Sequence, residues 1–194
     1  MNKNIILQQA ANYFTDQTNL PSASEVVNSL LEAEKIAKKE KISYSWDNLI
    51  GTWRLCFVTG TKKTRKKTGI VLGAGRYLPK IVKISLSYSS QEESSTNQGN
   101  VENSVEIGGL KLSLTGPVKF VTPKNILAFD FTRMQIKFFG LTIYNGYIRD
   151  GKNKEASFYN NKISQQAFFS YFYITNSAIA ARGRGGGLAL WSKI

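Results

Sequence analysis

Residues 51–58 read GTWRLCFV, and the large apolar side chains Trp53, Leu55 and Phe57 occupy every second position within them. Successive side chains of a β-strand point to opposite faces, so this alternation predicts a strand with one buried face. Similar alternation or strand-like apolar runs recur in residues 82–88, 110–115, 127–132, 136–148, 167–174 and 188–191. We therefore predict a mainly β fold of eight to ten short antiparallel strands, arranged as a barrel or as a sandwich.

The first 48 residues show a helical period instead. Ser22 and Glu25 fit a capping box, in which each side chain binds a free backbone N–H of the first helical turn. The apolar stripe that follows them predicts an amphipathic helix. We expect residues 1–48 to form an N-terminal helical segment that packs on a β-barrel of residues 49–194.

The composition argues against catalysis. The chain contains no histidine and a single cysteine, Cys56, among 194 residues. It therefore lacks the commonest general base and the commonest metal ligand, and it cannot form an intrachain disulfide. Asp and Glu do not cluster around an aromatic or glycine-rich segment, so we expect no enzyme activity, no metal and no cofactor. The chain contains no run of about 18 uncharged apolar residues, so we expect no transmembrane helix.

The net charge of +13 is unevenly distributed, because the first 49 residues are almost neutral. A strongly basic region either faces an anionic partner or keeps the protein soluble by self-repulsion. The densest basic stretch follows the first predicted strand, and its cations are Lys62, Lys63, Arg65, Lys66 and Lys67. We expect these residues to dock on an anionic membrane surface, where each contributes about 1 kcal/mol. The alternative is a solvated loop that only aids solubility.

Three residues are candidates for closing one end of a barrel. Gly51 lets the backbone turn tightly where the first strand begins, and the indole of Trp53 can plug the barrel. In a closed barrel the first and last strands are neighbours, so Arg182 is positioned to stack on Trp53 as a cation–π contact. The alternative for Trp53 is an ordinary core position.

Three segments resemble the plastid lipid-associated proteins, or fibrillins, of plastids and cyanobacteria. They are LIGTWRL at residues 49–55, PVKF at 117–120 leading into 126–139, and ARG at 181–183 continuing to Leu188. Their order and spacing fit the family pattern across residues 22–194. The chain departs from that pattern at Arg184, where the family commonly has Asp, and at residues 175–177, which replace acidic residues. A polar ligand contact by those acids therefore does not carry over, whereas the structural role of Arg182 does.

The resemblance implies a lipocalin-like barrel that binds small apolar molecules and associates with lipid bodies or photosynthetic membranes. In such a barrel, the loop of residues 62–67 would lie at the open end. Because the N-terminus shows no transit peptide, we expect a cytoplasmic protein, peripheral to the thylakoid membrane of a cyanobacterium. The implied ligands are carotenoids, quinones, lipids or fatty acids.

Six aromatic residues are expected to point into the barrel and line a ligand cavity. They are Phe57, Phe129, Phe131, Phe138, Tyr171 and Trp191. An eight-stranded barrel is just wide enough either to hold one small ligand or to be filled by its own side chains. A solid aromatic core is therefore the alternative to a lined pocket.

Two other functions compete with ligand binding. Residues 182–187 read RGRGGG and resemble an RGG-type RNA-binding tract, which makes a basic single-domain RNA-binding protein the first alternative. The tract is single and lies between apolar strands rather than in a disordered tail. The second alternative is a bilin lyase of lipocalin-like shape, an enzyme that attaches pigments to cysteines of partner proteins, for which the sequence offers no positive signal.

Overall fold

The computed structural model describes residues 3–16, 18–60, 75–90 and 97–194. Eight antiparallel strands close into a barrel, in which each strand pairs with the next in the order β1, β3, β4, β5, β6, β9, β10, β11 and back to β1. The bounds are β1 (Gly51–Thr59), β3 (Lys83–Ser90), β4 (Gln98–Ile107), β5 (Leu110–Val121), β6 (Ile126–Phe129), β9 (Ala167–Ile174), β10 (Ala178–Gly183) and β11 (Leu188–Lys193). The predicted mainly β, closed antiparallel barrel is confirmed, and its first and last strands pair with each other.

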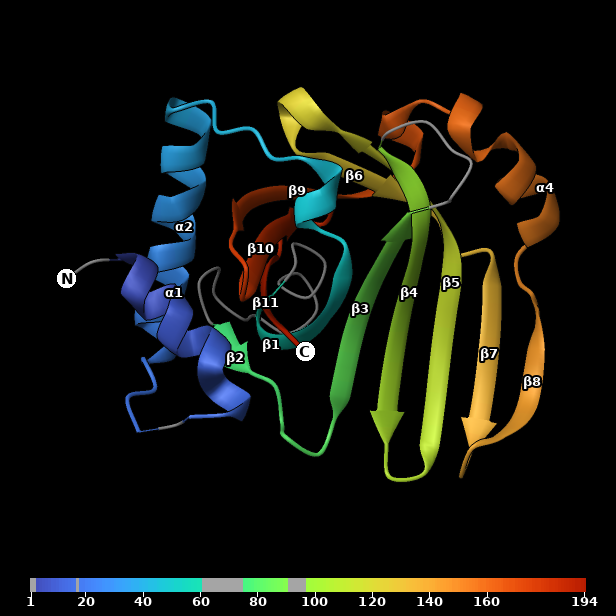
Figure 1. Ribbon diagram of the computed structural model, residues 1–194, viewed down its shortest axis with the longest axis horizontal. Helices are drawn as coiled ribbons and strands as arrows, with labels where there is room; N and C mark the ends of the chain where they lie inside the picture. The colour runs from blue at the N-terminus through green and yellow to red at the C-terminus, as the bar shows by residue number, and fades with distance from the viewer. Residues whose placement is uncertain (1–2, 17, 61–74, 91–96) are drawn as a thin grey trace.

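Two helices cover one side of the barrel (Figure 1). They are α1 (Lys3–Ala11), which continues into η1 (Asn12–Phe14), and α2 (Ala23–Lys39). The predicted capping box starts α2, because the Glu25 amide donates to Ser22 Oγ and the Ser22 amide donates to the Glu25 carboxylate. Apolar side chains of both helices pack on the outer faces of β1, β9, β10 and β11, in a cluster that includes Leu7, Val26 and Leu30.

A second cluster fills the barrel interior, and one end of the barrel is capped. The short helix η2 (Trp46–Asn48) leads into β1 and lies over this closed end, where the indole of Trp46 contacts the rings of Tyr88 and Phe120. Leu49 and Trp53 are fully buried beside it. The closed end therefore holds a solid hydrophobic core.

A β-bulge in β1 divides its side chains between the two clusters. Leu55 pairs with Trp191 and Phe57 pairs with Leu190, so one extra residue, Cys56, lies between them. A bulge of this kind reverses the in–out alternation. Trp53 and Leu55 consequently face the barrel interior, whereas Cys56 and Phe57 face the helices.

Beyond the barrel, the sheet continues as an open, five-stranded wall on the side away from the helices (Figure 1). We call this part the open sheet; it consists of the turn-proximal halves of β3, β4 and β5 with β7 (Arg133–Phe138) and β8 (Leu141–Tyr147). Strand β5 pairs with β6 at Val118–Val121 and with β7 at Leu110–Thr115, so the sheet forks between the two. Gly116 lies at this fork, where a Cβ atom would be 2.0 Å from the Asp130 carbonyl oxygen.

The remaining elements are connections. Strand β2 (Gly75–Tyr77) pairs with β1, and η3 (Thr122–Lys124) joins β5 to β6. Helix α4 (Gly151–Ser157) and the short helices η4 (Phe158–Asn160) and η5 (Ile163–Gln165) lead from β8 back to the barrel at β9. Residues 136–148, expected to be strand-like, contain the end of β7, a turn at residues 139–140 and the whole of β8. None of the described helices combines the length and the apolarity needed to cross a bilayer.

Candidate ligand-binding site

The structure brings together four of the six aromatic residues predicted to line a cavity. Phe129, Phe131, Tyr171 and Trp191 belong to the interior cluster, and the centroids of Phe129 and Phe131 are 5.3 Å apart. Phe169 completes the group: its ring stacks on Phe129 at 5.0 Å and meets Trp191 edge-on at 5.5 Å. Phe169 was not among the predicted residues, although it lies two residues before Tyr171 and therefore on the same face of β9.

The other two predicted aromatic residues lie elsewhere. Phe57 does not face the interior, because the bulge at Cys56 turns its ring toward the helices, where it meets Tyr77 edge-on at 5.1 Å. Phe138 lies at the end of β7, far along the open sheet, with 49% of its surface exposed. Their predicted position among the interior rings is wrong, because β1 contains a bulge and β7 leaves the barrel.

A buried tyrosine pair lies next to the aromatic group, on the side of the closed end. The hydroxyl groups of Tyr88 and Tyr171 form a hydrogen bond of 2.7 Å. Burial raises the pKa of both phenols above the ordinary value, so both stay neutral. Tyr88 also contacts Trp46, and both lie in the buried cluster that contains Leu49 and Trp53. The expected solid aromatic core therefore describes the closed half of the barrel.

In the opposite half of the barrel, several interior side chains are less buried. Leu55, Phe131, Phe169 and Ala189 pack against the interior cluster but are only partly buried. They surround the end at which β9 begins and β10 ends. We call this end the mouth, and its lining consists of aromatic and aliphatic side chains.

The apolar lining does not stop at the mouth but continues over one face of the open sheet. Directly paired residues share a face, so the strand register groups Ile84, Val105, Leu112, Ile136 and Tyr144 in one row. The first four side chains of this row are only partly buried. The next row toward the barrel contains Leu86, Leu114 and Met134, with one polar residue, Asn103, between the two leucines. This face of the open sheet thus extends the apolar surface of the barrel interior.

The opposite face of the open sheet is polar. Its rows contain Ser85, Ser104, Ser113, Gln135 and Asn145, and, one row closer to the turns, Lys83, Glu106, Lys111, Lys137 and Thr142. A sheet with one apolar and one polar face normally buries the apolar face against another layer. Here the apolar face stays partly exposed among the described residues.

Trp53 occupies the predicted position at the closed end, but Arg182 does not stack on it. The Trp53 indole is fully buried and donates a 2.7 Å hydrogen bond to the Leu49 carbonyl oxygen. The cation over its ring is Lys193, whose Nζ lies 5.1 Å from the centroid. Gly51 adopts a φ of +125°, and Lys193 also lies against it.

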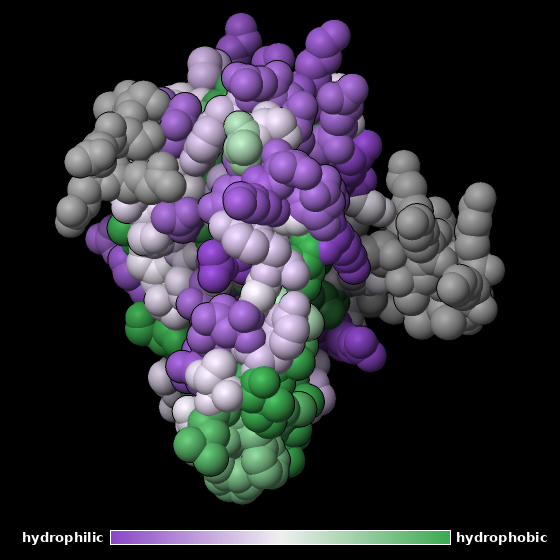
Figure 2. Space-filling model, turned by 90° about the vertical axis from the view of Figure 1, so that its right-hand side faces the viewer, coloured by the Kyte–Doolittle hydropathy of each residue, from purple (hydrophilic) through white to green (hydrophobic). Residues whose placement is uncertain are grey.

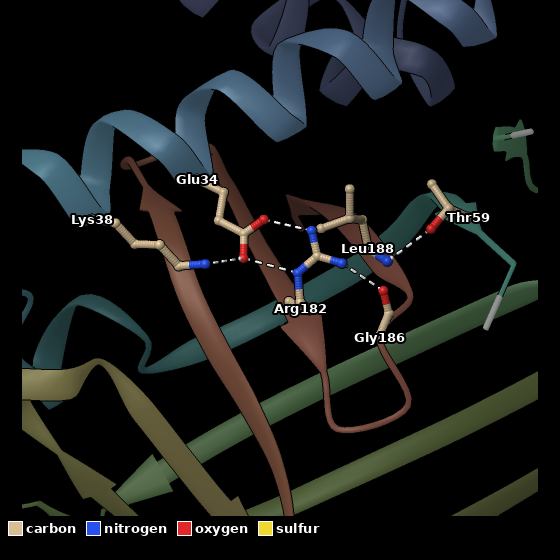
Figure 3. A network of polar contacts seen from close by, with 6 residues as sticks. All are labelled: Glu34, Lys38, Thr59, Arg182, Gly186 and Leu188. Atoms are coloured by element: carbon tan, nitrogen blue, oxygen red, sulfur yellow. Dashed lines mark hydrogen bonds and ion pairs between the residues drawn. The ribbon is translucent and has the colours of Figure 1, made fainter. Parts of the chain in front are cut away.

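Arg182 connects α2 to the β10–β11 hairpin instead (Figure 3). Its Nε donates to Glu34 Oε1 at 2.8 Å, its Nη2 donates to Glu34 Oε2, and its Nη1 donates to the Gly186 carbonyl oxygen at 2.6 Å. Lys38 adds a 3.1 Å ion pair to the same carboxylate. The hydrogen bond from Arg182 is the main cause that lowers the pKa of Glu34. The predicted cation–π contact is wrong because the outer face of β10 points to the helix.

Both arginines of the RGRGGG tract are used within the chain. Besides the contacts of Arg182, Arg184 Nη1 donates to the Gln166 carbonyl oxygen at 2.9 Å. The tract forms the end of β10 and a turn leading into β11. The predicted docking residues Lys62, Lys63, Arg65, Lys66 and Lys67 lie outside the described residues.

Within the described part of the chain, no three His, Cys, Asp or Glu side chains come together in a group that could hold a metal ion. No protein-family model matches the sequence, and neither does any curated protein.

Proposed function

We propose that this protein binds a small apolar molecule, such as a lipid, quinone, carotenoid or fatty acid, without chemical conversion. The ligand would enter at the mouth and lie on the aromatic group of Phe131, Phe169 and Trp191. Its remaining length would cover the apolar face of the open sheet. Sites for such ligands are concave and mostly apolar, with few polar groups.

The observation that carries this proposal is the continuity of the apolar surface from the barrel interior to the open sheet. The side chains along it are partly buried, from Phe131 at the mouth to Ile136 on β7. Leaving them in contact with water costs free energy, at about 25 cal/mol per Å² of apolar surface. An elongated apolar ligand would remove that surface from water.

We place this binding at or near a photosynthetic membrane, as the resemblance to fibrillins implies. The basic residues 62–67 would dock the protein on anionic lipid, next to the source or destination of the ligand. The contacts of Arg182 and Arg184 within the chain weaken the case for an RNA-binding tract, since those guanidinium groups already have partners.

A titration with two apolar probes tests the proposal. Cis-parinaric acid and decylubiquinone are added to the detergent-free protein, and binding is followed by probe fluorescence and by quenching of tryptophan emission, to which Trp191 contributes. We expect Phe131→Asp to weaken binding at least about tenfold, because a charge would face the apolar ligand. Phe131→Leu should retain most of the affinity.

The matched control is Phe139→Asp, which places the same charge on an aromatic position in the distant β7–β8 turn. It should bind both probes as the wild type does. Equal affinities of the wild type and Phe131→Asp, or no binding of either probe to the wild type, would overturn the proposed site.

A further inference from the structure

The far end of the open sheet carries a compact group of exposed apolar side chains. They belong to the turns of the β4–β5 and β7–β8 hairpins, and we call them the apolar tip: Ile107, Leu110, Phe138, Phe139, Leu141 and Ile143. Phe139 is 76% exposed and Leu141 is 75% exposed. Figure 2 shows hydrophobic side chains gathered at this lower end of the molecule, whereas hydrophilic ones dominate above it. A contiguous patch of this kind marks an interaction surface.

The tip is held in a defined shape by contacts between the two turns. The Phe139 backbone N–H donates a 2.7 Å hydrogen bond to the Gly109 carbonyl oxygen, which joins one turn to the other. Gly109 has no side chain, and the Phe139 ring covers it: a Cβ atom there would lie 2.8 Å from the ring. Phe138 and Phe139 meet edge-on with their centroids 4.7 Å apart. The apolar side chains are therefore presented by a preformed pair of turns.

Charged and aromatic residues follow the tip in layers along the strands. The row immediately behind it contains Lys83, Glu106, Lys111 and Lys137, with Lys111 directly opposite Lys137. Like charges that face each other across two strands repel. Lys111 also forms a 3.3 Å ion pair with Glu102, in which the two side chains are 41% and 38% exposed. Such exposed pairs contribute little, so an anionic group bound between the two lysines would still relieve their repulsion. Tyr144 lies in the next row of the other face.

This order matches the order of layers at a membrane surface. Apolar side chains favour the hydrocarbon boundary, whereas lysine and tyrosine favour the headgroup region. A second copy of the chain fits the tip poorly, because tip-to-tip contact would bring the lysine rows of both copies together. Lysine rows and an apolar tip on one end are complementary to an anionic bilayer.

We propose that the apolar tip inserts into the surface of an anionic lipid bilayer, while Lys111 and Lys137 contact the lipid headgroups. This contact is separate from the basic residues 62–67 and requires no ligand in the barrel. It would orient the open sheet with its turns in the membrane and its apolar face leading from the lipid to the mouth.

Flotation with vesicles tests the insertion. The full chain is mixed with vesicles of phosphatidylcholine alone or with added phosphatidylglycerol. The double variant Phe139→Ser/Leu141→Ser removes two exposed side chains and leaves the backbone hydrogen bond between the turns in place, so the barrel should be unaffected. We expect it to lose at least about tenfold in partitioning to both kinds of vesicle. The control Leu31→Ser/Ile194→Ser changes two exposed apolar residues elsewhere and should partition as the wild type does.

Vesicles of phosphatidylcholine alone separate the tip from the basic residues 62–67, because a neutral surface gives lysines little attraction. A tryptophan placed by Phe139→Trp should be quenched by brominated lipids. Unchanged partitioning of the serine variant, or no quenching of Trp at position 139, would overturn the proposal. So would a wild type that forms a dimer which the serine variant cannot form, since the tip would then bind a second copy. None of these readouts depends on the probes used for the ligand site.

Discussion

Glu34 on α2 and Arg182 on β10 lie 148 residues apart in the sequence, and their side chains form two hydrogen bonds that tie the N-terminal helices to the barrel. The carboxylate is almost buried, and the guanidinium is one-third exposed. A bidentate arginine–carboxylate pair fixes both distance and orientation. The pair therefore sets where α2 lies against β10, next to the hairpin that carries RGRGGG.

Replacing the carboxylate should destabilise the protein. We expect Glu34→Gln to lower the free energy of unfolding by about 2 to 3 kcal/mol, because Arg182 would lose its charged partner in a partly buried position. Urea unfolding followed by circular dichroism measures this change. Glu40→Gln, the same substitution at an exposed position just after α2, is the control and should change stability little. Equal stabilities of the two variants would show that the Glu34–Arg182 pair does not stabilise the packing of α2 on β10.

The same pair predicts a pH dependence. The hydrogen bond from Arg182 lowers the pKa of Glu34 below 4.5, its value in an unfolded chain. A lowered pKa stabilises the folded state fully above pH 4.5, and this contribution is lost as the pH falls through the folded pKa. The stability difference between the wild type and Glu34→Gln should therefore narrow below pH 4.5. A difference that stays constant in urea titrations across this range would contradict the assigned interaction.

Trp53 should be among the residues that contribute most to stability. Its side chain is fully buried at the closed end and its N–H is bonded to Leu49. We expect Trp53→Ala to cost about 3 kcal/mol or more, as truncating a core aromatic does. Trp53→Phe, which keeps most of the volume but leaves the Leu49 carbonyl without this donor, should cost about half as much. A loss under about 1 kcal/mol for Trp53→Ala would mean that the closed end repacks around the change.

The buried tyrosine pair predicts a non-additive double substitution. Removing one hydroxyl, by Tyr88→Phe or Tyr171→Phe, leaves the other without this partner in the barrel interior, which should cost about 1 to 3 kcal/mol. Removing both hydroxyls leaves no unpaired polar atom, so the double variant should be no less stable than either single one. A double-mutant cycle by thermal unfolding measures this coupling, and additive losses would show that the two hydroxyls act independently.

Alternating apolar residues were sufficient to predict a mainly β fold of short antiparallel strands, because each strand buries one face and exposes the other. They left a barrel and a sandwich both open, and the resemblance to fibrillins implied the barrel. The pattern failed where the backbone departs from a regular strand. The bulge at Cys56 turns Phe57 outward, and no residue in GTWRLCFV distinguishes a bulge from regular alternation. The run at 136–148 conceals a turn, since Phe139 and Gly140 are surrounded by apolar residues on both sides.

The partner of Arg182 could not be predicted, for a different reason. Both the Trp53 ring and the Glu34 carboxylate can bind an arginine. Which of them Arg182 contacts depends on whether its side chain points into the barrel or toward the helices. Four of the six aromatic residues predicted for the interior were placed there correctly. Phe129 and Trp191 lie within β6 and β11, Phe131 follows β6, and Tyr171 precedes the register shift in β9. The apolar tip required the structure, since exposure of Phe139 and Leu141 follows from how far the hairpins extend beyond the barrel.

The most direct test of apolar ligand binding is native mass spectrometry of the protein purified without detergent from the cells that produce it. We expect one apolar molecule per chain, with the mass of a lipid, quinone, carotenoid or fatty acid, and its loss in Phe131→Asp. Recovery of the protein without any such molecule, or with RNA that nuclease removes, would rule out apolar ligand binding as its function.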